Sequence, residues 1–116
     1  MSGGALWVSN NHLMTDIGVE DTPKDALGYL KETTGGSVSE ARLRAYVEAA
    51  PKMTRYLCEH TQVDLVATPE YPDYYPGASG YCSGGRCLEA KSFDARRLGD
   101  EFLQMREAAF QAMVIG

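Results

Sequence analysis

The chain has 116 residues, enough for one domain and too few for two. Hydrophobic residues make up 44% and charged residues 23%, a balance that excludes wholesale disorder and fibrous repeats. The 16 acidic residues outnumber the 11 basic ones, for a formal net charge of -5. This argues against general nucleic-acid binding, because an acidic surface repels phosphate backbones.

The sequence indicates neither a membrane span nor a secretory signal. No apolar run approaches the roughly 20 residues needed to cross a bilayer. The N-terminal segment lacks the positive charges and the long apolar stretch of a signal peptide. Three cysteines are an odd number, which disfavours a complete disulfide framework, so we expect reduced thiols and a cytoplasmic location.

Residues 3–36 predict a short strand, a loop and a first helix. Residues 3–8 are apolar and form either a strand or the end of a glycine-rich turn, and residues 10–12 are a polar loop. Thr22 is a suitable N-cap, followed by Pro23 at the first helical position. The glycines at 35–36 end this helix.

The next segment predicts helices on either side of a proline. The helix begins at Ser37 or Ser39, and Ser37 has the capping-box spacing to Glu40. Pro51 interrupts the apolar stripe, so we expect a kinked pair of helices. Cys58 follows on the same helical surface and is expected in the core. The stripe before the proline consists of Leu43, Tyr46, Val47 and Ala50.

Residues 63–68 predict the best strand of the sequence, ended by Pro69. The proline- and glycine-rich residues 69–85 that follow predict a long irregular loop. Four of the seven tyrosines lie in it, at positions 71, 74, 75 and 81. Loops of this length are usually functional or disordered, and the aromatic content argues against disorder.

A last helix is predicted from Asp94, a good N-cap. We interpret its apolar stripe as core packing. The stripe consists of Leu98, Phe102, Met105, Ala109 and Met113.

Three groups of residues are candidates for chemistry. Tyr74 and Tyr75 lie between prolines, where phenols are held rigidly and can donate hydrogen bonds or stack on flat rings, although a packed aromatic loop explains them equally well. Gly84 and Gly85 with Arg86 form either an anion site or a surface turn. The histidine and cysteine spacings fit no common zinc pattern, so no metal is expected.

Several segments, in order, resemble one family. Residues 2–11 resemble the S-G-G-x-x-W-x-P-x-N segment of FAD-dependent dehydrogenases in the fumarate reductase and succinate dehydrogenase flavoprotein superfamily. The 3-ketosteroid delta-1-dehydrogenases are the most similar branch. Further similar stretches are residues 18–22, 49–53, 73–76 and 84–89.

The resemblance implies an α/β fold: residues 1–116 are one partial, Rossmann-like FAD/NAD(P)-binding domain, locally mostly helical with one or two short strands. The strand at 63–68 is then expected to lack its sheet partners. Three positions depart from the family's usual residues, since Ser9 replaces a proline, Gly77 an acidic residue and Cys87 a serine. The family's G-x-G-x-x-G turn and substrate-binding domain have no counterpart here.

The resemblance also implies a function. The chain is expected to be part of an FAD-dependent dehydrogenase acting on a 3-ketosteroid or similar cyclic ketone. Ser2, Gly3 and Gly4 resemble the FAD-contacting segment, and Tyr74, with Tyr75 as second choice, resembles a tyrosine that assists the catalytic base. The alternative is a non-catalytic remnant or binding module that pairs with a complementary chain or associates with itself.

Overall fold

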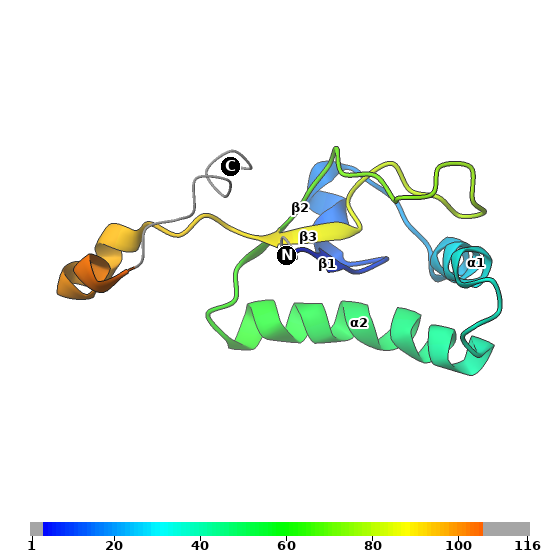
Figure 1. Ribbon diagram of the computed structural model, residues 1–116, viewed down its shortest axis with the longest axis horizontal. Coiled ribbons are helices and arrows are strands. Elements are labelled where there is room, and N and C mark those ends of the chain that lie inside the picture. The colour runs from blue at the N-terminus through cyan, green and yellow to red at the C-terminus, as the bar shows by residue number, and fades with distance from the viewer. Residues whose placement is uncertain (1–3, 106–116) are drawn as a thin grey trace.

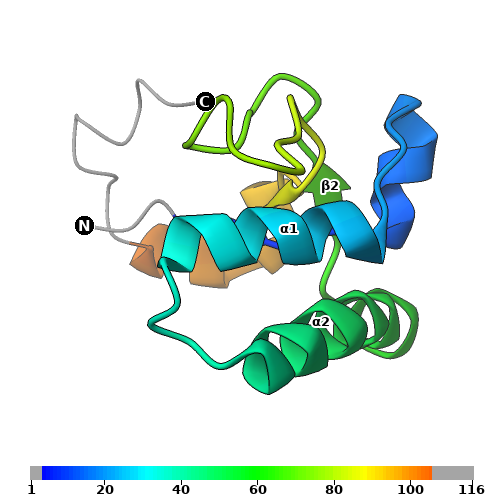
Figure 2. The same ribbon diagram turned by 90° about the vertical axis from the view of Figure 1, so that its right-hand side faces the viewer.

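A computed structural model describes residues 4–105, in which two long helices cover one side of a small sheet (Figure 1). Helix α2 lies along the sheet, and α1, seen end-on in Figure 1 and lengthwise in Figure 2, crosses it at one end. In chain order the elements are β1 (Leu6–Trp7), η1 (His12–Ile17), α1 (Pro23–Thr34), α2 (Glu40–His60), β2 (Leu65–Ala67), β3 (Cys87–Ala90) and η2 (Ala95–Gln104). Within these residues no helix is both long and apolar enough to cross a membrane.

Helix α1 has the ends that its sequence predicts. The Thr22 hydroxyl accepts a hydrogen bond from the Asp25 amide, and Pro23 occupies the first turn. Gly35 follows in the left-handed conformation at φ 54°, and its N–H bonds back to the Glu32 carbonyl. The local signals are sufficient here because both ends of the helix are closed by side chains and backbone within the segment itself.

Helix α2 begins at the second of the two predicted positions, but without the predicted capping box. Its N-cap is Ser39, whose side chain makes no capping hydrogen bond. The Ser37 hydroxyl instead donates to the Thr34 carbonyl, and the Glu40 carboxylate pairs with Lys31 and Arg44. The predicted Ser37–Glu40 capping box is therefore wrong, because both side chains have other partners.

The predicted break at Pro51 is also wrong, since α2 runs as one helix of 21 residues through the proline. Val47, Ala50 and Thr54 on its inner face are buried, and the Thr54 hydroxyl donates to the Ala50 carbonyl. Burial on both sides of the proline stabilises the helix, and tertiary packing contributes more to helices than local propensity does.

The sheet has three antiparallel strands in the order β1-β3-β2. Strand β2 lies within the predicted segment at 63–68, but the expectation that it lacks partners is wrong because it pairs with β3. Strand β3 is the central strand, and it is the one that the sequence did not predict. It is short and follows two glycines, so its pairing with β1 and β2 comes from distant segments rather than from a local signal.

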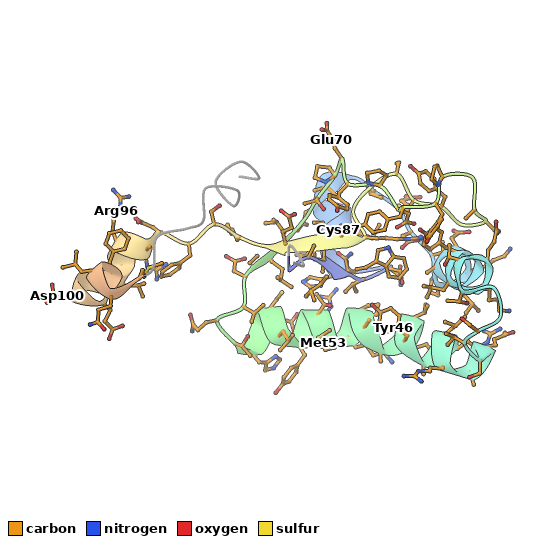
Figure 3. The ribbon with its side chains drawn as sticks, in the orientation of Figure 1. Tyr46, Met53, Glu70, Cys87, Arg96 and Asp100 are labelled. Atoms are coloured by element: carbon orange, nitrogen blue, oxygen red, sulfur yellow. The ribbon has the colours of Figure 1, made fainter. Side chains whose placement is uncertain are left out.

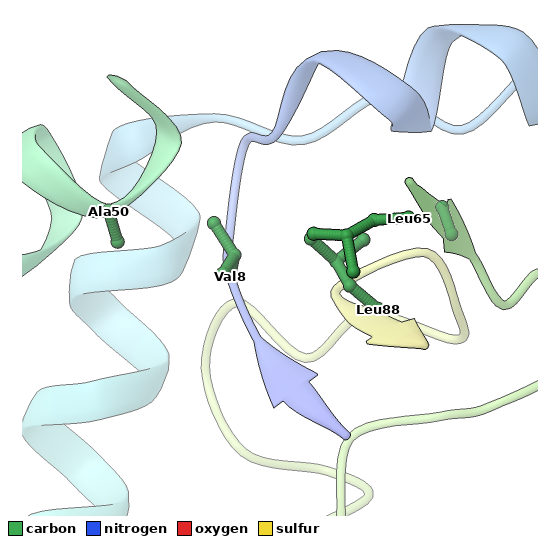
Figure 4. Packing of buried hydrophobic residues seen from close by; sticks show 5 residues of the cluster. Val8, Ala50, Leu65 and Leu88 are labelled. Atoms are coloured by element: carbon green, nitrogen blue, oxygen red, sulfur yellow. The ribbon is translucent and has the colours of Figure 1, made fainter. Parts of the chain in front are cut away.

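The core lies between the sheet and α2. Leu88, in the central strand, is fully buried opposite Leu6 in β1 and Ala67 in β2. Figure 4 shows Leu65 beside Leu88, with Val8 between them and Ala50 of α2. Cys58 packs against this cluster and is half-buried, close to its predicted place in the core.

The segment after β3 does not pack as predicted. Element η2 is a 3-10 segment kinked at Gly99, and none of its residues is buried. Leu98, Phe102 and Met105 are exposed, and Figure 3 shows Arg96 and Asp100 far from the sheet. The predicted core stripe is therefore wrong over the described part of this segment. The other two stripe residues, Ala109 and Met113, lie outside the described residues.

Candidate functional site

The tyrosine-rich loop, residues 69–86, closes over an aromatic cavity at the junction of β1 and α1. The cavity has a volume of about 280 Å³. Its walls come from four places: the start of the chain, the middle of α1, the loop and the first residue of β3. The lining residues are Ala5, Trp7, Tyr29, Leu30, Tyr71, Pro72, Asp73, Tyr74 and Cys87. Aromatic rings with a few polar groups are typical of sites for flat organic ligands.

The two tyrosines singled out in the sequence differ in position. Tyr74 lines the cavity, and its hydroxyl lies 3.1 Å from the hydroxyl of Tyr71, which also lines it. Tyr75 does not line the cavity, and its backbone N–H donates to the Tyr29 hydroxyl at 3.3 Å. The side chain of Tyr74 is 76% exposed, so its phenol is accessible to a ligand.

Two phenols of the cavity are held in their protonated form. The hydrogen bond to Tyr74 raises the pKa of Tyr71, and the nearby Cys87 and Glu89 add to this. Burial raises the pKa of Tyr29, against the opposing N–H of Tyr75, and the Asp73 carboxylate raises it further. At neutral pH both groups are therefore protonated phenols and not phenolates.

Arg86 is neither an anion site nor part of a surface turn. It is 1% exposed, and its guanidinium is bound by Asp21 at 2.6 and 2.9 Å and by Asp73 at 2.7 Å. Burial lowers the pKa of Arg86, but the hydrogen bond and charge of Asp21 together with the charge of Asp73 raise it, and the net shift is upward. We call these residues the Asp21–Arg86–Asp73 triad. The sequence did not reveal it, because its members lie 65 and 13 residues apart and only the fold joins them.

Trp7 connects the triad to both helices. Its ring stacks on Tyr29 of α1 at 5.9 Å and on Tyr46 of α2 at 6.3 Å between centroids. Arg86 lies 5.4 Å from the centre of the Trp7 ring, close enough for a cation–π interaction. The Trp7 indole N–H donates to the Asp73 carboxylate at 2.7 Å. The cavity wall is thus built on a tightly connected group of side chains.

The predicted FAD-contacting residues are only partly described. Ser2 and Gly3 lie outside the described residues. Gly4 has a φ of +82°, which favours glycine, and a Cβ added there would meet no atom within 4 Å. The next residue, Ala5, lines the cavity. A side chain at Gly4 would therefore be disfavoured by the backbone conformation and not by a described neighbour.

The cysteines are all free thiols. Cys87 is buried at the cavity, and Figure 3 shows it on β3 in the centre of the molecule. The Cys82 thiol donates to the Gly84 carbonyl. Among residues 4–105, no three His, Cys, Asp or Glu side chains gather closely enough to hold a metal ion.

The fold and the site define the class: an α/β unit in which an aromatic cavity lies beside a small antiparallel sheet. A family model described as an FAD binding domain matches residues 1–112. The chain therefore belongs to the FAD binding domain family, and FAD is the cofactor of that family. This confirms the predicted fold class, except that the sheet has three strands where one or two were expected.

Known relatives cover most of this chain. The 3-oxosteroid 1-dehydrogenase of Mycobacterium tuberculosis (strain ATCC 25618 / H37Rv) is 39% identical over 107 residues, which are 92% of this chain and 19% of that protein. The 4-oxocyclohexanecarboxylate 2-dehydrogenase of Sinomonas cyclohexanicum is 35% identical over 101 residues, 86% of this chain and 18% of that protein. The chain thus spans about a fifth of the length of these relatives.

A solved structure shares the same arrangement. The 3-ketosteroid delta1-dehydrogenase from Sterolibacterium denitrificans, in complex with 1,4-androstadiene-3,17-dione, superposes with a TM-score of 0.73 at 44% identity. The match covers 93% of this chain and 19% of that one. The predicted resemblance to this branch of flavoproteins is confirmed.

Proposed function

We propose that this chain is part of an FAD-dependent dehydrogenase that removes two hydrogens from a 3-ketosteroid or a similar cyclic ketone. The observation that carries the proposal is the aromatic cavity, which is bordered by the segment resembling the FAD-contacting one and by the Tyr71–Tyr74 pair. The names of the relatives, a steroid dehydrogenase and two acting on oxocyclohexane or oxocyclohexene carboxylates, support a cyclic ketone as substrate.

The chain's own residues have two roles in this proposal. Ser2, Gly3 and Gly4 would hold the flavin, which when bound supplies the acceptor for the hydride. Tyr74 would assist the transfer of the substrate proton, because a phenol at the cavity can pass a proton along a hydrogen bond to or from a neighbouring group. Its bond to Tyr71 supports this choice over Tyr75, which lies outside the cavity lining.

Exchange of segments tests the proposal. Residues 1–112 replace the matching stretch of the Mycobacterium tuberculosis relative, and the purified chimera is assayed for flavin content and for dehydrogenation of a 3-ketosteroid with an artificial electron acceptor. We expect bound flavin and turnover. A chimera that holds flavin but leaves the ketosteroid unchanged contradicts the proposal.

In the active chimera, Tyr74→Phe should lower turnover by about 10²-fold or more, the usual scale for an acid–base participant. Flavin content should stay the same, because the lost hydroxyl serves the substrate side. Tyr75→Phe should matter less. Tyr56→Phe is the matched control, since this exposed tyrosine stacks on His60 in α2 and lies outside the cavity lining. Full turnover in Tyr74→Phe would remove the catalytic role of the loop.

We propose a partner surface as a second function. The segment from Phe93 to Met105 exposes apolar side chains, with Phe93 57% and Leu103 83% exposed. Exposed apolar groups of this kind mark interaction surfaces, which supports pairing with a complementary chain. Light scattering of the chain alone and with the remaining sequence of the relative tests this. If the chain is monomeric both alone and in the presence of the remaining sequence of the relative, the pairing is contradicted.

We also propose a cytoplasmic location, which the three free thiols support because disulfides are rare in reducing compartments. Cell fractionation with an antibody against the chain tests it, and recovery of the chain outside the cytoplasm contradicts it.

A further inference from the structure

Asp73, in the tyrosine-rich loop, is bonded through both carboxylate oxygens and through its backbone amide. One carboxylate oxygen accepts the Trp7 indole N–H at 2.7 Å. The other accepts Arg86 at 2.7 Å and the Cys82 amide at 3.1 Å. The Asp73 amide in turn donates to the Cys82 carbonyl at 3.0 Å, so residues 73 and 82 close the loop on itself. The Asp73 side chain, which makes the first three of these contacts, is almost fully buried.

The phenols on either side of Asp73 have few contacts of their own. Tyr74 follows it directly and is 76% exposed, and Tyr71 precedes it by two residues and is 40% exposed. Their side chains touch each other through the two hydroxyls and through rings 6.3 Å apart. An exposed side chain on an unanchored loop would sample many positions, and proton transfer needs one.

We propose that Asp73 is a positioning residue, which fixes the backbone between Tyr71 and Tyr74 to Trp7, Arg86 and Cys82 so that the two phenols meet at the cavity. The effect of Asp73 on turnover rests on the proposed function. Its effect on the position of the two phenols does not, and it can be tested on this chain alone.

Asp21 is the comparison residue that distinguishes a positioning role of Asp73 from a contribution to stability alone. It binds the same guanidinium with two hydrogen bonds and is equally buried. Its other partners are the amides of Asn10 and Thr22, which lie outside the tyrosine-rich loop. Asp21→Asn and Asp73→Asn therefore each remove one buried charge beside Arg86, but only the second removes bonds of the segment between Tyr71 and Tyr74.

The direct test is the titration of the tyrosines in the 116-residue chain, labelled with carbon-13 at the phenolic carbon and followed by NMR. The Tyr71 signal is assigned by its loss in Tyr71→Phe. In the unchanged chain the pKa of Tyr71 should be raised above 10.0 by its bond to Tyr74. Asp73→Asn should return it toward the ordinary value, whereas Asp21→Asn should leave it raised. A raised pKa in folded Asp73→Asn, or an equal loss in both variants, overturns the proposal.

The fluorescence of Trp7, the single tryptophan, and circular dichroism report whether each variant folds. If Asp73→Asn does not fold, amide hydrogen exchange in the unchanged chain decides. The amides of Asp73 and Cys82 should then exchange as slowly as those of the central strand β3. Exchange as fast as that of exposed loop amides overturns the anchoring role.

The chimera described above tests the catalytic consequence. Asp73→Asn should lower kcat by about the 10²-fold expected of Tyr74→Phe, with KM changed less than about twofold. Asp64→Asn is the control, because its ion pair with Lys91 is exposed and distant from the cavity lining. Unchanged kcat in Asp73→Asn overturns the positioning role. If the parent chimera is itself inactive, the proposed function fails, and the NMR titration still decides the role of Asp73.

Discussion

At the scale of single residues, buried polar groups without partners carry the clearest consequences. Ser9 is fully buried, and its hydroxyl has no hydrogen-bond partner among the described residues. Leaving a buried hydroxyl unpaired costs about 1–3 kcal/mol. Ser9 is therefore a local source of instability.

Ser9→Ala is expected to raise the free energy of unfolding by about 1 kcal/mol, because it removes the unpaired hydroxyl and leaves only a small cavity. Urea denaturation followed by Trp7 fluorescence measures the change. Ser37→Ala is the control, since its exposed hydroxyl has a partner in the Thr34 carbonyl and its loss should not stabilise the chain. A loss of more than about 1 kcal/mol in Ser9→Ala would mean that the hydroxyl has a partner after all.

Stability is expected to fall at alkaline pH. Burial raises the pKa of the Cys87 thiol above 9.0 and that of the Tyr29 phenol above 10.0. The folded state keeps both protons to higher pH than the unfolded chain does. The contribution of these two protonated groups to the free energy of unfolding is therefore complete below pH 9. It is lost as the pH rises through the pKa values of the folded state.

Thermal unfolding between neutral pH and about pH 11 measures this loss. The Tm should be level up to about pH 9 and then decline, and Cys87→Ala should delay the decline until the tyrosine range begins near pH 10. If the Tm of the unchanged chain stays level above about pH 10, burial does not raise the pKa values of Cys87 and Tyr29.

At the scale of elements, the sequence predicted what local signals determine. Thr22, Pro23 and Gly35 define α1 because each acts within one turn of the helix end. Pro51 misled the prediction because the burial of neighbouring residues in α2 outweighs the missing N–H. Strand β3 was missed for the opposite reason, since its partners β1 and β2 lie far away in the sequence.

The tyrosine-rich loop also contacts α1 directly, at a position that only glycine can occupy. Gly80 has a φ of +70°, and a Cβ there would lie 1.9 Å from the Asp25 carbonyl oxygen. Gly77 in the same loop has a φ of +92°, but a Cβ there would meet open space. Both glycines have a positive φ, which disfavours other residues, but only Gly80 lies so close to α1 that a Cβ would collide with it.

Gly80→Ala is expected to lower the free energy of unfolding by about 3 kcal/mol or more, from backbone strain together with displacement of the loop from α1. Gly77→Ala should cost only the strain, about 1–2 kcal/mol. Chemical denaturation of both variants measures the difference. Equal losses in the two variants would mean that the loop does not pack on the first turn of α1.

At the scale of the whole molecule, the chain is more extended than its length requires. Its radius of gyration is 16.6 Å, against about 13 Å for a compact chain of this size. Figure 1 shows the η2 segment standing apart from the sheet and helices. Of the two tyrosines that the sequence singled out, Tyr74 lines the cavity and Tyr75 does not. The sequence did not indicate the triad, because Asp21, Asp73 and Arg86 become partners only in the folded chain.

The last prediction concerns the cofactor, which the whole molecule must hold. The chain alone is expected to bind FAD weakly or not at all. The sequence contains no G-x-G-x-x-G motif, the turn that places a helix N-terminus at the pyrophosphate. The aromatic cavity of about 280 Å³ lies at the lower limit of small-molecule sites, so it can receive a ring system but not a whole dinucleotide.

The purified chain is mixed with FAD, freed of unbound flavin on a desalting column and examined by visible absorbance. We expect no more than a trace of flavin, whereas the chimera with the Mycobacterium tuberculosis relative should keep about one flavin per chain, because the relative's remaining sequence would supply the missing pyrophosphate-binding turn. If the 116-residue chain retained a stoichiometric yellow flavin, Gly4 and the cavity would have to bind the cofactor without that turn, and the division of the site between this chain and the rest of the domain would be wrong.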